Sequence, residues 1–158
     1  MKINYLTTLL FVLCITVSKV YTFHSLGHMA VAAIAEFHLK KSTIGSEAHK
    51  WATDLITPFS DYCGEINHPF VESATWSDKI KDQGWFTMAN WHFSNIKLAS
   101  PGFEIPVDNT SDENIVWAID TATKFLSGNN KDFSGKSKEL LGKSLEMRNL
   151  IHWIGDIH

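Results

Sequence analysis

Apolar residues recur at every third or fourth position along several stretches of the chain, the spacing that places side chains on one face of an α-helix. Each apolar stripe is expected to pack against a common core. The pattern predicts helices over about residues 25–41, 46–56 and 112–126, and a last helix from about residue 137 into the C-terminal segment.

Local residues refine the ends and faces of these helices. The second is expected to stop before Thr57-Pro58, because the residue before a proline disfavours helical backbone. Ser111 or Asp112 is suited to cap the third helix. The stripe of the first helix, expected to face the core, comprises Leu26, Met29, Ala30, Ala33, Ile34 and Phe37.

Residues 58–103 form a long stretch in which proline and glycine interrupt the helical pattern and aromatic residues are frequent. Loops rich in tryptophan bury it, so this stretch is expected to fold over the core. The sequence therefore predicts an all-α fold, a helical bundle with a long loop-rich insert. The aromatic residues concerned are Trp76, Trp85, Phe86, Trp91 and Phe93.

The first residues have the pattern of a secretory signal peptide. Lys2 precedes an apolar run over residues 6–17, and Val20-Tyr21-Thr22 resembles a cleavage site. The apolar run is too short to be a confident membrane span, so no stable membrane association is expected. We therefore expect removal of residues 1–22 in a secretory compartment, leaving residues 23–158 as one domain.

The charge of the chain limits how it can bind a polyanion. The formal net charge is −3, and loss of Lys2 and Lys19 with the leader makes the remainder more acidic. An acidic protein does not hold nucleic acid by a general positive field. For a phosphate ligand, bound cations must supply the attraction locally.

Cysteine and asparagine give two further signals of a secreted protein. Because Cys14 lies in the leader, Cys63 has no partner in residues 23–158. It is either buried and inert, or paired with a cysteine from chain that is absent here. The sequon Asn109-Thr110-Ser111 predicts glycosylation at Asn109.

Candidate metal ligands begin with His152 and Asp156, which are four residues apart and so lie one turn apart on a helix. A nitrogen and an oxygen donor suit zinc better than calcium, which prefers oxygen ligands. The alternative is a helix-end histidine beside a carboxylate. Upstream candidates are His28, Asp78 and His92. Their alternative roles are, respectively, an exposed residue in the first turn of a helix, a helix cap and a histidine packed in the core.

Four motifs place these residues in a common order. They are Gly27-His28 leading into Val31-Ala-Ala-Ile34-Ala35, then Ala74-Thr-Trp76-Ser-Asp78 with Lys81, then Trp91-His92-Phe93, and finally His152-Trp-Ile-Gly155-Asp156-Ile-His158. Through these motifs, residues 23–158 resemble the zinc-dependent single-strand nucleases of the S1/P1 nuclease family, within the phospholipase C/P1 nuclease superfamily. The family has tryptophan at the position of Phe23 and alanine at that of Ser77.

The resemblance implies two neighbouring zinc sites. His28, Asp156 and the freed amino group and carbonyl of Phe23 would hold one zinc, provided that cleavage falls between Thr22 and Phe23. The other zinc would be held by Asp78, His92 and His152, with Asp156 close to both. Zinc ions there would activate water and draw in a phosphodiester.

The resemblance also implies roles around the metal. Asp78 and Lys81 would be catalytic, with Lys81 neutralising charge at phosphorus; the alternative for Lys81 is a solvated surface charge. Phe93 would stack on an unpaired base, or else be packed in the core, and Asn95 would bind that base's edge.

The family pattern continues beyond His158 with Gln-Pro-Leu-His and the remaining ligands of a third zinc. We therefore expect residues 23–158 to be the N-terminal half of the enzyme, with weak or absent catalysis, from a gene in which a stop codon encodes glutamine. The expected parent is a secreted zinc-dependent endonuclease that cleaves single-stranded DNA or RNA to 5′-phosphorylated products, with 3′-nucleotidase activity left open. The alternatives are a zinc phospholipase C-like hydrolase, a non-catalytic zinc-binding module, and a helical domain with structural histidines.

Overall fold

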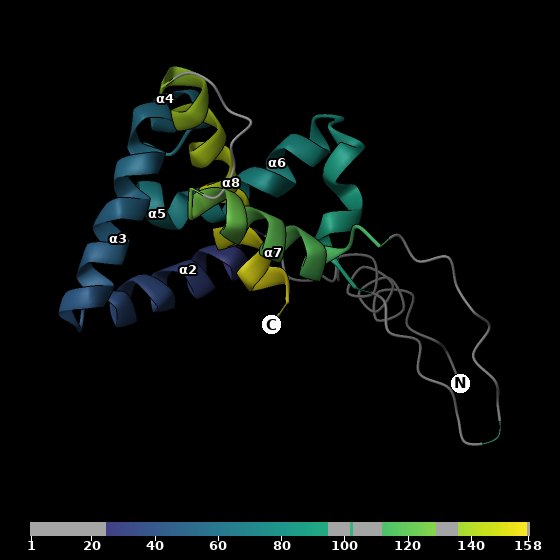
Figure 1. Cartoon of the computed structure of the whole chain (residues 1–158), viewed down its shortest axis with the longest axis horizontal. Helices are drawn as coiled ribbons and strands as arrows, with labels where there is room; N and C mark the ends of the chain where they lie inside the picture. The colour runs from purple at the N-terminus through teal and green to yellow at the C-terminus, as the bar shows by residue number, and fades with distance from the viewer. Residues whose placement is uncertain (1–24, 95–101, 103–111, 129–135, 158) are drawn as a thin grey trace, which may run out of the picture.

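The computed structural model describes residues 25–94, 102, 112–128 and 136–157. Every regular element in these ranges is helical, which confirms the predicted all-α fold (Figure 1). The elements are α2 (Ser25–Leu39), α3 (Thr43–Ile56), η1 (Thr57–Phe59), α4 (Ser60–Cys63), α5 (Pro69–Glu72), η2 (Ser73–Thr75), α6 (Trp76–Asp82), η3 (Phe86–His92), α7 (Ile115–Leu126) and α8 (Lys136–Asp156).

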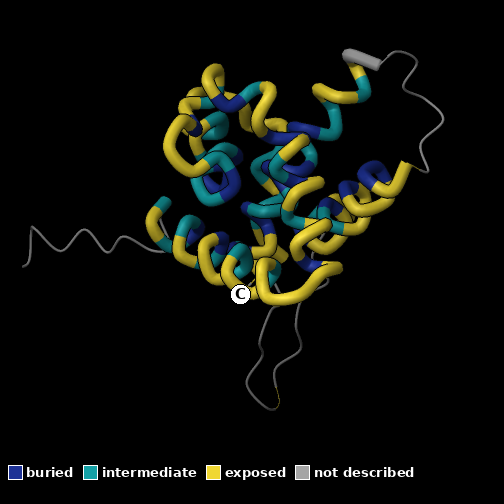
Figure 2. The backbone as a smooth tube through the Cα atoms, turned by 90° about the vertical axis from the view of Figure 1, so that its left-hand side faces the viewer, coloured by how far each residue is buried: buried dark blue, intermediate teal, exposed yellow. Residues whose placement is uncertain are grey.

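The last helix, α8, lies at the centre of the fold. It contacts α7 along one side and α2, α3, η2 and α6 along others (Figure 1). The core around it has two parts, and buried segments face inward while exposed ones line the outside (Figure 2). One part comprises Ala52, Leu55, Ile56, Phe70, Leu126 and Met147, and the other Ile115, Ala118, Ala122 and Trp153.

The connection between α2 and α3 is tighter than the sequence pattern predicts. Helix α3 begins at Thr43 because the Ser42 hydroxyl accepts a hydrogen bond from the Gly45 amide (3.0 Å) and caps it. A Cβ at Gly45 would lie 2.3 Å from the Leu39 carbonyl oxygen, so glycine permits this close turn. The tight turn brings α3 beside α2 and sets the start of the bundle.

The apolar stripe of α2 does not face the core as predicted. Leu26, Ile34 and Phe37 are exposed, and the buried residues are Ala32 and His28. Helix α2 meets α3, α5, η2 and α8, and Leu39 at its end packs against the core. The exposed Phe37 ring is covered in part by the Lys41 ammonium, 3.9 Å from its centroid.

Where it is described, the segment predicted to be irregular is a run of short helices. Pro69 starts α5, and the Glu72 carboxylate accepts bonds from the amides of Asn67 and His68 (both 3.1 Å). Trp76 and Trp91 are partly buried, as expected, but the prediction was wrong for two other aromatic residues. Trp85 and Phe86 are 67% and 70% exposed, because the chain reverses at Gly84 (φ 97°) and they follow the turn at the surface.

The N-cap of α7 is Asn114, not Asp112. Its side-chain oxygen accepts hydrogen bonds from the amides of Val116 (2.9 Å) and Trp117 (3.3 Å), so the helix starts at Ile115. Ser111 lies outside the described residues. Among the helices that are described, none combines the length and the apolar character needed to cross a bilayer.

Candidate metal centre

The C-terminal end of α8 carries two side chains of the candidate centre. His152 and Asp156 lie one turn apart, with Nε2 of the imidazole 3.1 Å from Oδ2 of the carboxylate. His152 is fully buried and Asp156 is partly exposed. Their spacing on the helix therefore directs one nitrogen and one oxygen to the same place, as the sequence predicts.

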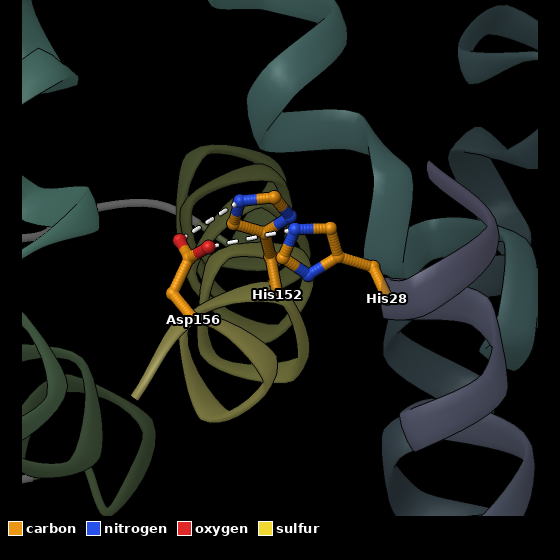
Figure 3. Close-up of side chains that lie close together, drawn as sticks. All are labelled: His28, His152 and Asp156. Carbon is orange, nitrogen blue, oxygen red and sulfur yellow. Dashed lines mark ion pairs between the residues drawn. The ribbon is translucent and has the colours of Figure 1, made fainter. Parts of the chain in front are cut away.

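His28 reaches the same place from the first turn of α2. Its ring stacks on that of His152 (centroids 3.9 Å apart), and its Nε2 is 3.4 Å from Asp156 Oδ1 (Figure 3). At 1% exposure it is not the exposed first-turn residue of the ordinary alternative. Burial, together with the nearby His152, lowers the pKa of His28 against the opposing effect of Asp156 and Asp78. The imidazole is therefore neutral near pH 7, the form that binds metal.

Asp78 from α6 and His92 from η3 complete the cluster. His92 Nδ1 is 2.9 Å from Asp156 Oδ2 and 3.0 Å from His152 Nε2. Asp78 Oδ1 is 3.7 Å from His92 Nδ1 and 3.8 Å from His152 Nε2. Asp78 also approaches His28, with Oδ2 3.7 Å from its Nε2. The structure thus brings together five of the predicted ligands, from segments far apart in sequence.

A backbone contact fixes the tautomer of His152. Its Nδ1 lies 2.6 Å from the Ala74 carbonyl oxygen, which can only accept, so Nδ1 carries the proton and donates it. The lone pair of Nε2 is therefore free to face the cluster, as in metal-bound histidines supported from behind. Sequence reasoning missed this contact because a backbone acceptor leaves no signal in the residue type.

Both carboxylates are ionised near neutral pH. Burial alone would raise the pKa of Asp156, but the adjacent His152 and His92 side chains outweigh this effect and hold the pKa below its ordinary value. For Asp78, burial is likewise outweighed, chiefly by the hydrogen bond from Lys81, and the pKa is lowered. The cluster therefore combines anionic carboxylate oxygens with imidazole nitrogens.

Two groups of atoms in the cluster could hold a metal ion. One consists of His28, His152 and Asp156, and the other of Asp78, His92 and His152, with ligand atoms within 4.8 Å of one another in each. Imidazole nitrogen and carboxylate oxygen are donors that zinc accepts, and a calcium site would use oxygen throughout. The residues present thus fit zinc, and because only Nε2 of His152 has a free lone pair, that ring can serve one ion.

Of the remaining predicted site residues, Lys81 and Phe93 lie within the described part of the chain. Lys81 is one turn after Asp78, and its ammonium is 2.5 Å from the Asp78 Oδ1. Phe93 is 48% exposed, which argues against core packing, and its carbonyl accepts a bond from the Ile115 amide (3.3 Å). Phe23, Asn95 and Asn109 lie outside the described residues.

The sequence also gave no warning of a buried ion pair beneath the centre. Arg148 lies one turn before His152 on α8, and its guanidinium donates to both carboxylate oxygens of Glu65 (2.8 and 2.6 Å). Nearby Cys63 is half-buried, with its pKa raised by burial, and forms no disulfide within the described residues.

The metal-free protein is expected to lose stability as the pH falls below about 6.5. His28 has a pKa below its ordinary value of 6.5, so the folded state binds fewer protons than the unfolded state in that range. Asp78 and Asp156, also with lowered pKa values, add to the loss below about 3.8. Urea unfolding in chelator at about pH 7.5 and 5.5 measures the effect. His28→Asn should flatten this dependence, and an unchanged dependence in that variant would contradict the assignment.

Comparison with known proteins gives one match. A family model described as S1/P1 Nuclease matches residues 23–158. No curated protein and no solved structure matches the chain significantly.

Proposed function

Because the chain belongs to the S1/P1 nuclease family, whose members are hydrolases that act on nucleic acids, we propose that it is a secreted zinc-dependent endonuclease. Its substrate would be single-stranded DNA or RNA, cleaved to 5′-phosphorylated products. The observation that carries the proposal is the meeting of three imidazoles and two carboxylates from α2, α6, η3 and α8. A chain with net negative charge requires such a local cation site to attract phosphate.

In this proposal the five side chains hold the metal and orient it. His28 and Asp156 would hold one zinc, and Asp78, His92 and His152 the other, with Asp156 close to both. Zinc would supply Lewis-acid chemistry, polarising a phosphoryl oxygen and making water more acidic. Cleavage after Thr22 would add the amino group of Phe23 as a ligand, and Asn109 would be glycosylated.

Lys81 would bind the phosphate. Its ammonium is held against Asp78, a proposed ligand, and its side chain is one-third exposed. When a cation takes over the negative charge of Asp78, the ammonium becomes available to another anion. A phosphodiester at the metal is then within reach of a positive charge that stabilises the developing charge on phosphorus.

Phe93 would stack on an unpaired base. It directly follows the proposed ligand His92, and its ring is half-exposed. Its backbone is tied to the start of α7, so the ring is presented from a fixed position. Stacking tolerates any base but requires that the base be unpaired, which favours single strands. Asn95 would bind the base edge.

The test compares hydrolysis of single-stranded DNA, duplex DNA and a phosphatidylcholine analogue by the purified protein with zinc. We expect single strands to be cleaved fastest, with activity lost in chelator and restored by zinc. The ratio of the hydrolysis rates on these substrates tests the proposal, independently of the absolute rate. Preference for the lipid analogue would indicate a phospholipase C-like hydrolase, and bound zinc without hydrolysis would indicate a non-catalytic module.

Replacing Phe93 by alanine is expected to raise KM for single-stranded DNA about tenfold, because stacking contributes about 1–3 kcal/mol per base. The value of kcat should change little, since Phe93 is not one of the proposed ligands. Tyr62→Ala is a matched control, because Tyr62 is a 91% exposed aromatic residue on α4. Equal KM values for the wild type and Phe93→Ala would remove Phe93 from the substrate site.

A further inference from the structure

A buried hydroxyl lies behind one of the proposed ligands. Ser77 is 1% exposed and directly precedes Asp78 in α6. Its Oγ is 3.3 Å from Nε2 of His92. The corresponding position in the family motif is alanine, so this contact belongs to the present chain and not to the motif.

The position of the proton on the His92 ring determines the role of this contact. Its other nitrogen, Nδ1, faces the cluster, 2.9 Å from Asp156 Oδ2 and 3.0 Å from His152 Nε2. A nitrogen that offers its lone pair to a cation cannot carry a proton, so in the metal-bound form the proton sits on Nε2. That N–H is buried and points to a polar atom, the Ser77 oxygen.

We propose that Ser77 is a positioning residue, which accepts a hydrogen bond from Nε2–H of His92 and so directs the Nδ1 lone pair at the metal. The contact parallels that of His152, whose Nδ1–H donates to the Ala74 carbonyl (2.6 Å). Outer partners of this kind fix both the tautomer and the orientation of a metal-binding ring.

One short segment, residues 74–78, thus contributes to all three proposed ligands of the second group, Asp78, His92 and His152. It supplies Asp78 as a ligand, the Ser77 hydroxyl behind His92 and the Ala74 carbonyl behind His152. The segment is buried from Ser73 to Thr75 and tied to the turn before it, with the Thr75 hydroxyl donating to the Glu72 carbonyl (2.9 Å). Its position is therefore set by the fold before any metal binds.

The inference rests on the proposed zinc centre and is tested first by zinc affinity. Ser77→Ala is expected to weaken zinc binding by about 10- to 100-fold, the usual effect of losing an outer partner of a ligand. Ser60→Ala is the matched control, because Ser60 is also a buried helical serine but donates to the Ile56 carbonyl, away from the cluster. It should stay within about twofold of the wild type, since it leaves the ligands untouched.

A second readout is specific to the hydrogen bond. In the zinc-loaded wild type, nitrogen-15 NMR should show His92 protonated on Nε2, with a proton that exchanges slowly; in Ser77→Ala that exchange should be faster. Wild-type binding with protonation on Nδ1, or equal affinity of Ser77→Ala and wild type, would overturn the role of Ser77 and leave the nuclease proposal intact. Equal weakening by both serine variants would also overturn it. Absence of zinc binding by the wild type would overturn the metal centre itself.

Discussion

Replacing His152 by alanine is expected to remove zinc from the site of Asp78 and His92 and to lower nuclease activity by about 100- to 1,000-fold. Its Nε2 faces both carboxylates and His92, so its loss leaves that group with two side chains. Metal ions contribute several kcal/mol of transition-state stabilisation, and about 1.4 kcal/mol corresponds to a tenfold change in rate. Zinc content by mass spectrometry and hydrolysis of single-stranded DNA measure the two effects.

A histidine outside the cluster provides the control for this variant. His49 on α3 is half-buried and bonded to Glu36 (2.9 Å), so His49→Ala removes a comparable imidazole but none of the proposed ligands. It should retain zinc and activity. Because His152 is fully buried, circular dichroism and thermal melting must show that the variant is folded, and His152→Asn serves if the alanine variant is not. Full zinc content in a folded His152 variant would contradict the account.

Replacing Arg148 by methionine is expected to lower the free energy of unfolding by about 3–5 kcal/mol, because it leaves a buried carboxylate without its counter-charge. Arg148 and Glu65 are both 0% exposed. The guanidinium also donates hydrogen bonds to the Ile56 carbonyl (2.9 Å), the Ser144 carbonyl (3.1 Å) and the Ser144 hydroxyl. The pair thus ties α8 to the end of α3 and to the loop after α4. Urea unfolding of metal-free protein measures the change.

The matched variants separate charge from packing. Glu65→Gln in the Arg148→Met background removes the uncompensated carboxylate, so the double variant should be more stable than the single one. Lys50→Met breaks an exposed pair with Asp54 and should change stability by no more than about 0.5 kcal/mol. If Arg148→Met is as stable as the wild type, the ion pair does not hold α8 in place.

The parts of the fold that the sequence predicts are those set by local spacing. Helices α3, α7 and α8 follow from apolar periodicity, and the placement of His152 beside Asp156 follows from one helical turn. The α2 stripe was misassigned because periodicity shows that a helix has an apolar face but not what covers it. His28, Ala32 and Leu39 lie on the packed side of α2, and Ile34 is exposed.

The parts that could not be predicted are long-range contacts. Residue type gives no sign that the Ala74 carbonyl orients His152, 78 positions away. Glu65 and Arg148 are 83 residues apart, and each alone looks like an ordinary surface charge. The meeting of His92 with Asp156 was expected from the motifs of a family, and their distances required the structure.

The most direct test of the central claim is X-ray diffraction from zinc-loaded crystals, recorded on both sides of the zinc absorption edge. The account predicts two anomalous peaks about 3.5–4 Å apart, one beside His28 and Asp156 and one beside Asp78 and His92. Each should lie about 2.0–2.2 Å from its nitrogen and oxygen ligands. Zinc bound elsewhere, with no peak among these five side chains, would contradict it.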